Sequence, residues 1–292
     1  MSLRARILLA LLLGAAPLAV AVTGAGADTI GPIQLLSKNS VEQATEATAP
    51  AISADGRFVA FAGSIGGLTG IFREEIATGA VVPVYAVAAF GAQASATTAP
   101  SISADGRYVS FTTVDQIDPA DDTGKATSDV YVADLATTPP TYELASALDR
   151  PGAVCEAGIT QPAVGEPEGI AYAEGKGGSI ATGRSALSAD GQKVVFVTKA
   201  ESNLTEGSGG STPGVPTPAL QVVVRDRATG CDTLVSAERD PVSGAMTTLP
   251  VEGGAEVSGT AVENLHGAAI SADGSTVAWL GTNLTLQVPV LG

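Results

Sequence analysis

Five aspartates lie close together in one polar segment of this 292-residue chain, and carboxylates at that density can hold a metal ion. They are Asp115, Asp118, Asp121, Asp122 and Asp129, with Gly124 among them. Calcium takes several oxygen ligands from a flexible backbone, and a glycine helps the chain turn around the ion. The spacing does not fit an EF-hand, because Pro119 and Val130 would take its first and twelfth positions. A solvated acidic loop is the simpler interpretation, and a calcium site is the alternative.

The chain has only two cysteines, Cys155 and Cys231, which are the second candidate for chemistry. An even number of cysteines in an exported chain usually forms a disulfide. The strand pattern described below, however, places Cys155 in a loop at one end of the strands. It places Cys231 at the start of a strand at the other end, about 17 Å away for a five-residue strand. Pairing needs Cα atoms within about 7 Å, so it requires the long loop to pass over the outer edge of the sheet.

Few residues suit an enzyme. His266 is the only histidine, and the chain contains no Gly-x-Ser-x-Gly motif that would mark a nucleophile elbow. A hydrolase or lyase that uses loop carboxylates is the alternative, but the sequence does not place two acids at a defined separation. We therefore expect a non-catalytic protein, and we assign no catalytic or cofactor-binding residue.

A sequence motif that recurs four times indicates the strands that position the aspartates and cysteines. The copies lie near residues 49–61, 99–111, 185–196 and 268–279. Each consists of an alternating apolar run, the letters Ser-Ala-Asp-Gly and a second alternating run, which is typical of a repeated β-hairpin. An Asp-Gly step allows the positive φ of a tight turn. We therefore interpret Asp55, Asp105, Asp190 and Asp273 as turn formers rather than ligands.

The repeats predict an all-β fold, a β-propeller of four-stranded antiparallel blades with about four blades present. The expected strands are 51–53, 58–62, 70–76 and 82–88 in the first blade, 101–103, 108–112, 129–135 and 142–147 in the second, 186–188, 193–198, 220–226 and 233–237 in the third, and 269–271, 276–280 and 286–291 in the fourth. A strand at 33–37 would complete the fourth blade and close the ring. The alternative is that the chain is part of a longer, six-bladed propeller, and Pro289 in the final strand favours it because proline suits sheet edges.

Strand direction divides the connections into two sets. In a four-stranded meander, the first and third turns of every blade lie at one end of the strands, and all other connections lie at the opposite end. The first set is short throughout. The long segments 114–128, 149–183, 199–219 and 238–267 all belong to the second set. Loops on a rigid scaffold commonly carry function, so we expect this long-loop face to bind the partner.

The first 27 residues are typical of a signal peptide. Arg4 and Arg6 precede an apolar run from Ile7 to Val22, and Ala25-Gly26-Ala27 is a cleavage pattern. Cleavage would leave residues 28–292 as the propeller, with 13 basic against 30 acidic residues and a net charge of −17. Such a surface repels nucleic acid and anionic lipid. We expect a secreted or periplasmic protein that does not insert into a membrane.

The repeat itself resembles a known family. The phrase Pro-x-Ile-Ser-Ala-Asp-Gly-Arg, followed by strands such as Asp129 to Leu135 and Val223 to Arg227, is similar to the WD-like repeats of TolB-type propellers in bacterial exported proteins. Related propellers accompany the catalytic domain of prolyl oligopeptidases. The resemblance implies a protein-binding platform or a gate, but this sequence lacks both the N-terminal domain of TolB and a hydrolase domain. We expect a protein- or ligand-binding scaffold, monomeric, whose partner is a protein or another cell-envelope macromolecule.

Overall fold

The computed structural model describes the strands and short turns of the repeats. The described residues are 45–88, 99–118, 129–147, 149–150, 153, 155, 179–181, 185–199, 220–239, 246–248, 268–280 and 286–287. The chain divides into two compact units, Met1–Leu35 and Leu36–Gly292, and every described residue belongs to the second unit. The expected signal peptide and the expected closing strand at 33–37 lie outside these ranges. In the described part of the chain, no helix is long and apolar enough to span a bilayer.

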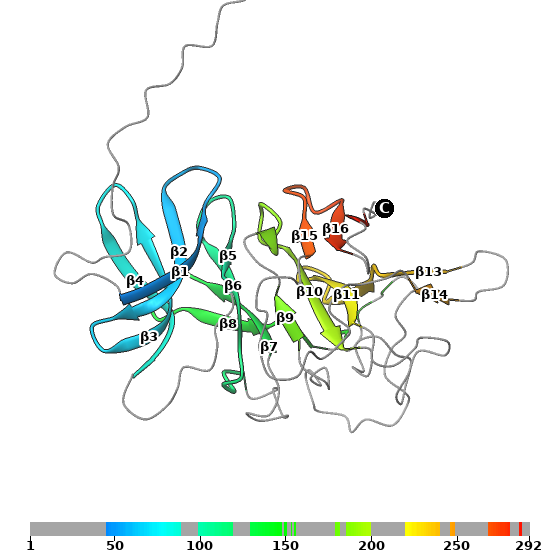
Figure 1. Ribbon diagram of the computed structural model, residues 1–292, viewed down its shortest axis with the longest axis horizontal. Helices are drawn as coiled ribbons and strands as arrows, with labels where there is room; N and C mark the ends of the chain where they lie inside the picture. The colour runs from blue at the N-terminus through cyan, green and yellow to red at the C-terminus, as the bar shows by residue number, and fades with distance from the viewer. Residues whose placement is uncertain are drawn as a thin grey trace, which may run out of the picture. The chain divides into compact units, whose positions relative to one another are not determined.

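Four antiparallel sheets contain most of the strands (Figure 1). The first blade consists of β1 (Thr45–Ile52), β2 (Phe58–Ile65), β3 (Leu68–Glu75) and β4 (Ala80–Ala88). The second consists of β5 (Ser101–Ile102), β6 (Tyr108–Thr113), β7 (Asp129–Asp134) and β8 (Thr141–Leu144). The third consists of β9 (Ser179–Ala181), β10 (Lys193–Lys199), β11 (Leu220–Asp226) and β12 (Cys231–Leu234), and the fourth of β15 (Ala268–Ile270), β16 (Val277–Leu280) and β17 (Leu286–Gln287). Each sheet pairs its strands in chain order, as a meander does.

Two expectations for the third blade are corrected. Its innermost strand is β9 at 179–181, and the expected strand at 186–188 contributes only an isolated bridge between Leu187 and Val194. Its outermost strand ends at Leu234, and the chain then enters a separate hairpin of β13 (Ala237–Arg239) and β14 (Met246–Thr248). Beyond Leu234, the Val235 N–H still donates to the Val222 carbonyl at 2.9 Å, but the Val222 N–H donates to the Ser236 hydroxyl at 2.9 Å instead of to a backbone carbonyl. Of the expected strand 286–291, only β17 lies within the described residues.

Successive blades pack face to face through a shared apolar core. One core cluster joins Phe58 and Ile71 of the first blade to Ile102 and Phe111 of the second. Another runs from Val130 of β7 through the third blade to Trp279 of β16. Meandering four-stranded sheets that stack in this way form a β-propeller, which confirms the fold class predicted from the repeats.

The innermost turns are also bonded to one another. The N–H of Asp55 donates to the carbonyl of Ala104 at 3.2 Å, the N–H of Ala104 to Ala189 at 2.8 Å, and the N–H of Ala189 to Ala272 at 2.8 Å. We call this series the turn ladder. Its bonds all run in the same direction, from each blade to the next.

A side chain from each preceding blade also covers the turn glycine of the next. A Cβ added to Gly106 would lie 3.0 Å from the Cβ of Phe58, and one added to Gly191 would lie 2.9 Å from the Cβ of Tyr108. At Gly274 the covering atom is Cδ of Lys193, 2.9 Å away. All three glycines have positive φ, so they serve both the turn and the close approach of the neighbouring blade.

Candidate functional site

The four Asp-Gly turns have identical internal bonding. In the first, the Ser53 hydroxyl donates to Asp55 Oδ1 at 2.6 Å, the Arg57 N–H donates to the same oxygen at 3.0 Å, and the Phe58 N–H donates to Ser53 Oγ at 3.0 Å. The other three turns use the pairs Ser103 and Asp105, Ser188 and Asp190, and Ser271 and Asp273. The hydroxyl of Ser271, with the N–H and hydroxyl of Ser275, lowers the pKa of Asp273 to about 2. The prediction that these aspartates form turns is confirmed.

Cations at the tight-turn end of the strands bind groups within the molecule. Arg73 donates to the carbonyl of Gly106 at 2.7 Å, and Lys193 donates to that of Gly274 at 3.2 Å. Both bonds connect one blade to the next. Arg227 reaches from the third blade to Glu143 of the second at 2.9 Å. Each junction between successive blades is thus bridged at this end by a basic side chain.

Aromatic rings at the same end lie between pairs of guanidinium groups. The Phe58 ring has Arg57 at 4.9 Å and Arg73 at 4.4 Å from its centroid. The Tyr108 ring has Arg107 at 4.7 Å and Arg227 at 4.6 Å. Because a cation over a ring face is attracted by the ring quadrupole, the stack of Arg227 on Tyr108 adds to the junction of the second and third blades. The stack on Phe58 lies within the first blade. Much of the positive charge in the described residues is therefore engaged in holding the propeller together.

The long connections all leave the strands at the opposite end. They run from β6 to β7, from β8 to β9, from β10 to β11 and from β14 to β15. The first blade differs, because a short turn with Gly66 and Gly67 joins β2 to β3 at this end. The predicted division into a short-turn face and a long-loop face agrees with the strand order, with one correction. The start of the segment 149–183 returns to the short-turn end, where Arg150 bonds Gly230 and Cys155 bonds Cys231. The interior of the long segments lies mostly outside the described residues.

The carboxylates proposed for calcium serve other contacts where they are described. Asp115 accepts a hydrogen bond from the Tyr85 hydroxyl at 2.8 Å. Burial is the main cause that raises the pKa of Tyr85, and the hydrogen bond to Asp115 is the second cause. Asp129 is buried and accepts from Ser146 at 2.8 Å. Within the described ranges, no group of three potential metal ligands includes Asp115, Asp118 or Asp129, while Asp121 and Asp122 fall outside those ranges. The calcium site stays a prediction.

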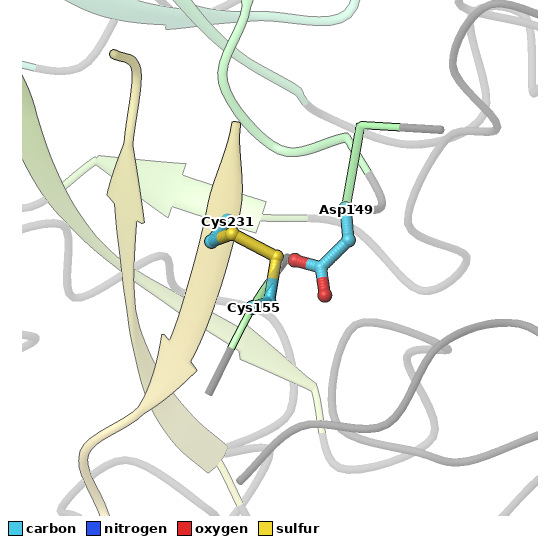
Figure 2. Close-up of side chains that lie close together, drawn as sticks. All are labelled: Asp149, Cys155 and Cys231. Carbon is cyan, nitrogen blue, oxygen red and sulfur yellow. A yellow bond between two sulfur atoms is a disulfide. The ribbon is translucent and has the colours of Figure 1, made fainter. Parts of the chain in front are cut away.

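The structure joins Cys155 to Cys231 in a disulfide (Figure 2). Their Cα atoms lie 5.5 Å apart, so the separation of about 17 Å expected from strand length is wrong. The reason is the path of the chain after β8. The N–H of Arg150 donates to the carbonyl of Gly230 at 2.7 Å, which brings this segment against the turn between β11 and β12. The segment therefore passes over the outer edge of the sheet to reach β12, which is the path that the sequence analysis required for a disulfide.

Asp149 lies beside this disulfide, and its carboxylate and the two sulfur atoms are within 4.8 Å of one another (Figure 2). Three such groups could hold a metal if the sulfurs were free thiolates, but here they are bonded to each other. Asp149 instead accepts a hydrogen bond from the N–H of Asp232 at 2.6 Å. The cluster thus fastens the segment after β8 to the third blade.

A buried ion pair lies next to the cluster and was missed by the sequence reasoning. Arg225 of β11 bonds Asp232 of β12 at 3.1 Å, and the two side chains are 0% and 2% exposed. Burial is the main cause that raises the pKa of Asp232 to about 8; Asp149 adds to the rise, and Arg225 opposes it. The two residues are direct cross-strand partners. The sequence could have predicted this pair, because a hairpin centred on the Ala228-Thr229-Gly230 turn places Arg225 opposite Asp232.

No protein-family model matches this chain, and no curated protein matches it. Among solved structures, it is similar to TolB from Acinetobacter baumannii, with 15% identity, a TM-score of 0.37, and 83% of this chain and 40% of that chain covered. It is similar to Kuenenia stuttgartiensis hydrazine synthase, with 12% identity, a TM-score of 0.40, and coverage of 83% and 58%. It is also similar to the propeller domain of the Trilobed protease from Pyrococcus furiosus, with 13% identity, a TM-score of 0.36, and coverage of 85% and 71%.

TolB is therefore among the structures that this chain resembles, as the repeat sequence predicted. The chain spans 40% of the length of this TolB and 56% of that of the putative TolB from Agrobacterium tumefaciens, so it covers about half of these structures. The fold assigned above follows from the sheets, the shared cores and the turn ladder of this chain itself.

Proposed function

We propose that this protein is an exported, non-catalytic propeller that binds a protein or another cell-envelope macromolecule through its long-loop face. The observation that carries the proposal is the unequal use of the two ends of the strands. At one end, short turns and basic side chains bond neighbouring blades to each other. At the other end, long polar connections leave a rigid sheet framework, and such loops are where binding residues are commonly found.

Export is supported by the composition of residues 1–27 and by the disulfide. An Arg-containing start, an apolar run and a small-residue cleavage pattern are typical of a signal peptide. Disulfides persist in oxidising compartments, so the bond between Cys155 and Cys231 fits a secreted or periplasmic protein. Mass spectrometry of the protein released from the cell would test this, with an N-terminus at Asp28 as the expected result.

Deletion of one long segment tests the binding face. The tagged protein is cross-linked in its native host, and co-purified proteins are quantified for the wild type, for a deletion of residues 206–218 and for Ala77→Lys. Ala77 is exposed in the turn between β3 and β4, at the short-turn end, so it serves as the matched control. We expect the deletion, or the equivalent deletion within 156–178, to lose a partner that Ala77→Lys retains.

The opposite pattern would overturn the proposal. A partner that survives deletion of each long segment but is lost in Ala77→Lys would place binding at the short-turn end. The calcium prediction is tested separately, by calorimetric titration of the chelator-treated protein and of Asp121→Asn/Asp122→Asn. Absence of a calcium-dependent heat would remove calcium from the proposal without affecting the binding face.

A further inference from the structure

The three junctions between successive blades share one design, in which each blade contributes a different half. The earlier blade gives an N–H to the turn ladder and a side chain that covers the next turn glycine. We call this the donor half. The later blade gives a carbonyl, the covered glycine and a branched apolar residue at the end of its innermost segment, which we call the acceptor half. The apolar residues are Ile102, Leu187 and Ile270.

The acceptor half of the first blade is uncovered. Ile52 occupies the position equivalent to Ile102, Leu187 and Ile270. It is 61% exposed, whereas the other three are 8%, 6% and 6% exposed. An exposed large aliphatic side chain forfeits the hydrophobic stabilisation that its three equivalents gain on burial.

The first turn glycine shows the same difference independently. Gly56 is exposed, and a Cβ added to it would meet no atom within 4 Å. Gly106, Gly191 and Gly274 are buried by the blade before them. Farther out on the same face, Val59 and Phe61 are buried in a cluster of their own, so the uncovered part is the inner edge, formed by Ile52 and the turn at 54–56.

The donor half of the fourth blade is likewise less covered than its equivalents. The last described bond of the turn ladder is accepted by Ala272, which is itself exposed. Ala278 of β16 is only half-buried, whereas the equivalent Ala60 and Ser110 are 0% exposed. The described array therefore presents an acceptor half at its first blade and a donor half at its fourth. The two halves are complementary, because the same pairing already occurs three times within the chain.

We propose that the inner edge of the first blade binds the fourth blade of a second copy of this chain. The contact is head-to-tail, and when two copies make it reciprocally they close a ring. The four described blades of two copies give eight, which is within the range that propellers use. In this dimer the Ala272 N–H of one copy extends the turn ladder to the Ala54 carbonyl of the other, and Ile52 becomes buried. The proposal replaces the monomer expected from the sequence and is independent of what the long-loop face binds.

Cysteine pairs test this arrangement directly. At the existing junctions, the turn glycine and the side chain that covers it bring their Cβ positions to 3.0 Å and 2.9 Å. A disulfide needs Cβ atoms about 3.5–4.5 Å apart, so a small relaxation permits one. The equivalent pair across the proposed contact is Gly56 and Thr276. We expect an equimolar mixture of purified Gly56→Cys and Thr276→Cys, once oxidised, to give a covalent dimer that contains one chain of each variant.

The mixture distinguishes two copies from one, because each chain carries only one of the new cysteines. Gly79→Cys mixed with Thr276→Cys is the matched control, since Gly79 also has positive φ and open space but lies in the turn between β3 and β4. Absence of the mixed dimer would overturn the proposal. So would a cross-link that forms only within a single chain of the Gly56→Cys/Thr276→Cys double variant, because that result means the chain closes on itself.

Sedimentation velocity gives a second measurement that requires no cross-link. We expect the wild type to sediment as a dimer at high concentration and Ile52→Glu to sediment as a monomer. Val82→Glu is the control, because Val82 is 39% exposed on β4, away from the inner edge, and this variant should remain dimeric. A wild type that stays monomeric at its highest soluble concentration, or a dimer that Ile52→Glu leaves intact, would contradict the proposal.

Discussion

Replacing Gly106 by alanine should destabilise the propeller more than the same change at Gly79. Both glycines have positive φ, +75° and +67°. Alanine in this left-handed region costs about 1–2 kcal/mol at either site. At Gly79 the added Cβ meets nothing within 4 Å, so no further loss is expected. At Gly106 it would overlap the ring and lie 3.0 Å from the Cβ of Phe58, which no rotation of that side chain can move.

Overpacking of this kind adds about 1–3 kcal/mol, so Gly106→Ala should lose about 2–5 kcal/mol of unfolding free energy. Phe58 cannot move aside freely, because guanidinium groups of Arg57 and Arg73 lie over its ring. Urea unfolding followed by circular dichroism and by fluorescence of the single, buried Trp279 measures both variants. Equal losses for Gly106→Ala and Gly79→Ala would refute the claim that the first two blades are pressed together at this glycine.

Three further predictions concern the third blade and the turns. Cys155→Ser/Cys231→Ser should lose about 2–5 kcal/mol in urea unfolding, because the bond spans 76 residues; a wild type whose urea midpoint is the same with and without reductant would contradict this. Above about pH 8, where Asp232 is ionised, Arg225→Met should cost about 3–5 kcal/mol, since it leaves the Asp232 carboxylate buried without its partner. Asp232→Leu should recover part of that loss in the double variant; equal stability of Arg225→Met and the double variant would rule out the ion pair as the cause. The pH dependence has two parts. The lowered pKa of Asp273 gives stability that is present above about pH 4 and lost toward pH 2. The raised pKa of Asp232 gives stability that is lost as pH rises from about 4 to about 8. When urea midpoints are measured against pH, Asp273→Ser should lack the loss at low pH, and Asp232→Asn should lack the loss between about pH 4 and about pH 8.

The repeated elements of the fold were predictable because each repeat supports the others. Four copies of Ser-Ala-Asp-Gly form the same hairpin, and β2, β6, β10 and β16 begin at or within one residue of the expected positions. The role of the turn aspartates followed from local chemistry alone, since Asp-Gly suits a turn with positive φ. The turn ladder was not predictable in the same way, because its bonds depend on how closely one blade lies against the next.

Features that occur once were harder to predict. Cys155 was placed correctly after β8, but the path of that segment depends on contacts of Arg150 and Asp149 with residues about 80 positions later. Nothing in local sequence marks such contacts. The pairing of Arg225 with Asp232 was within reach of sequence analysis, because the register of one short hairpin determines it. At the early end of β12, a serine hydroxyl accepts a hydrogen bond from β11 in place of a backbone carbonyl, which strand propensity does not reveal.

The disulfide has a consequence for the resistance of the protein to proteases. It closes a covalent loop from Cys155 to Cys231 that includes the two connections 156–178 and 200–219. A peptidase that cleaves once anywhere in this loop leaves both halves joined through sulfur. The cleaved protein would keep its mass under non-reducing conditions and separate into fragments only after reduction. A single cut in these loops therefore does not release part of the molecule.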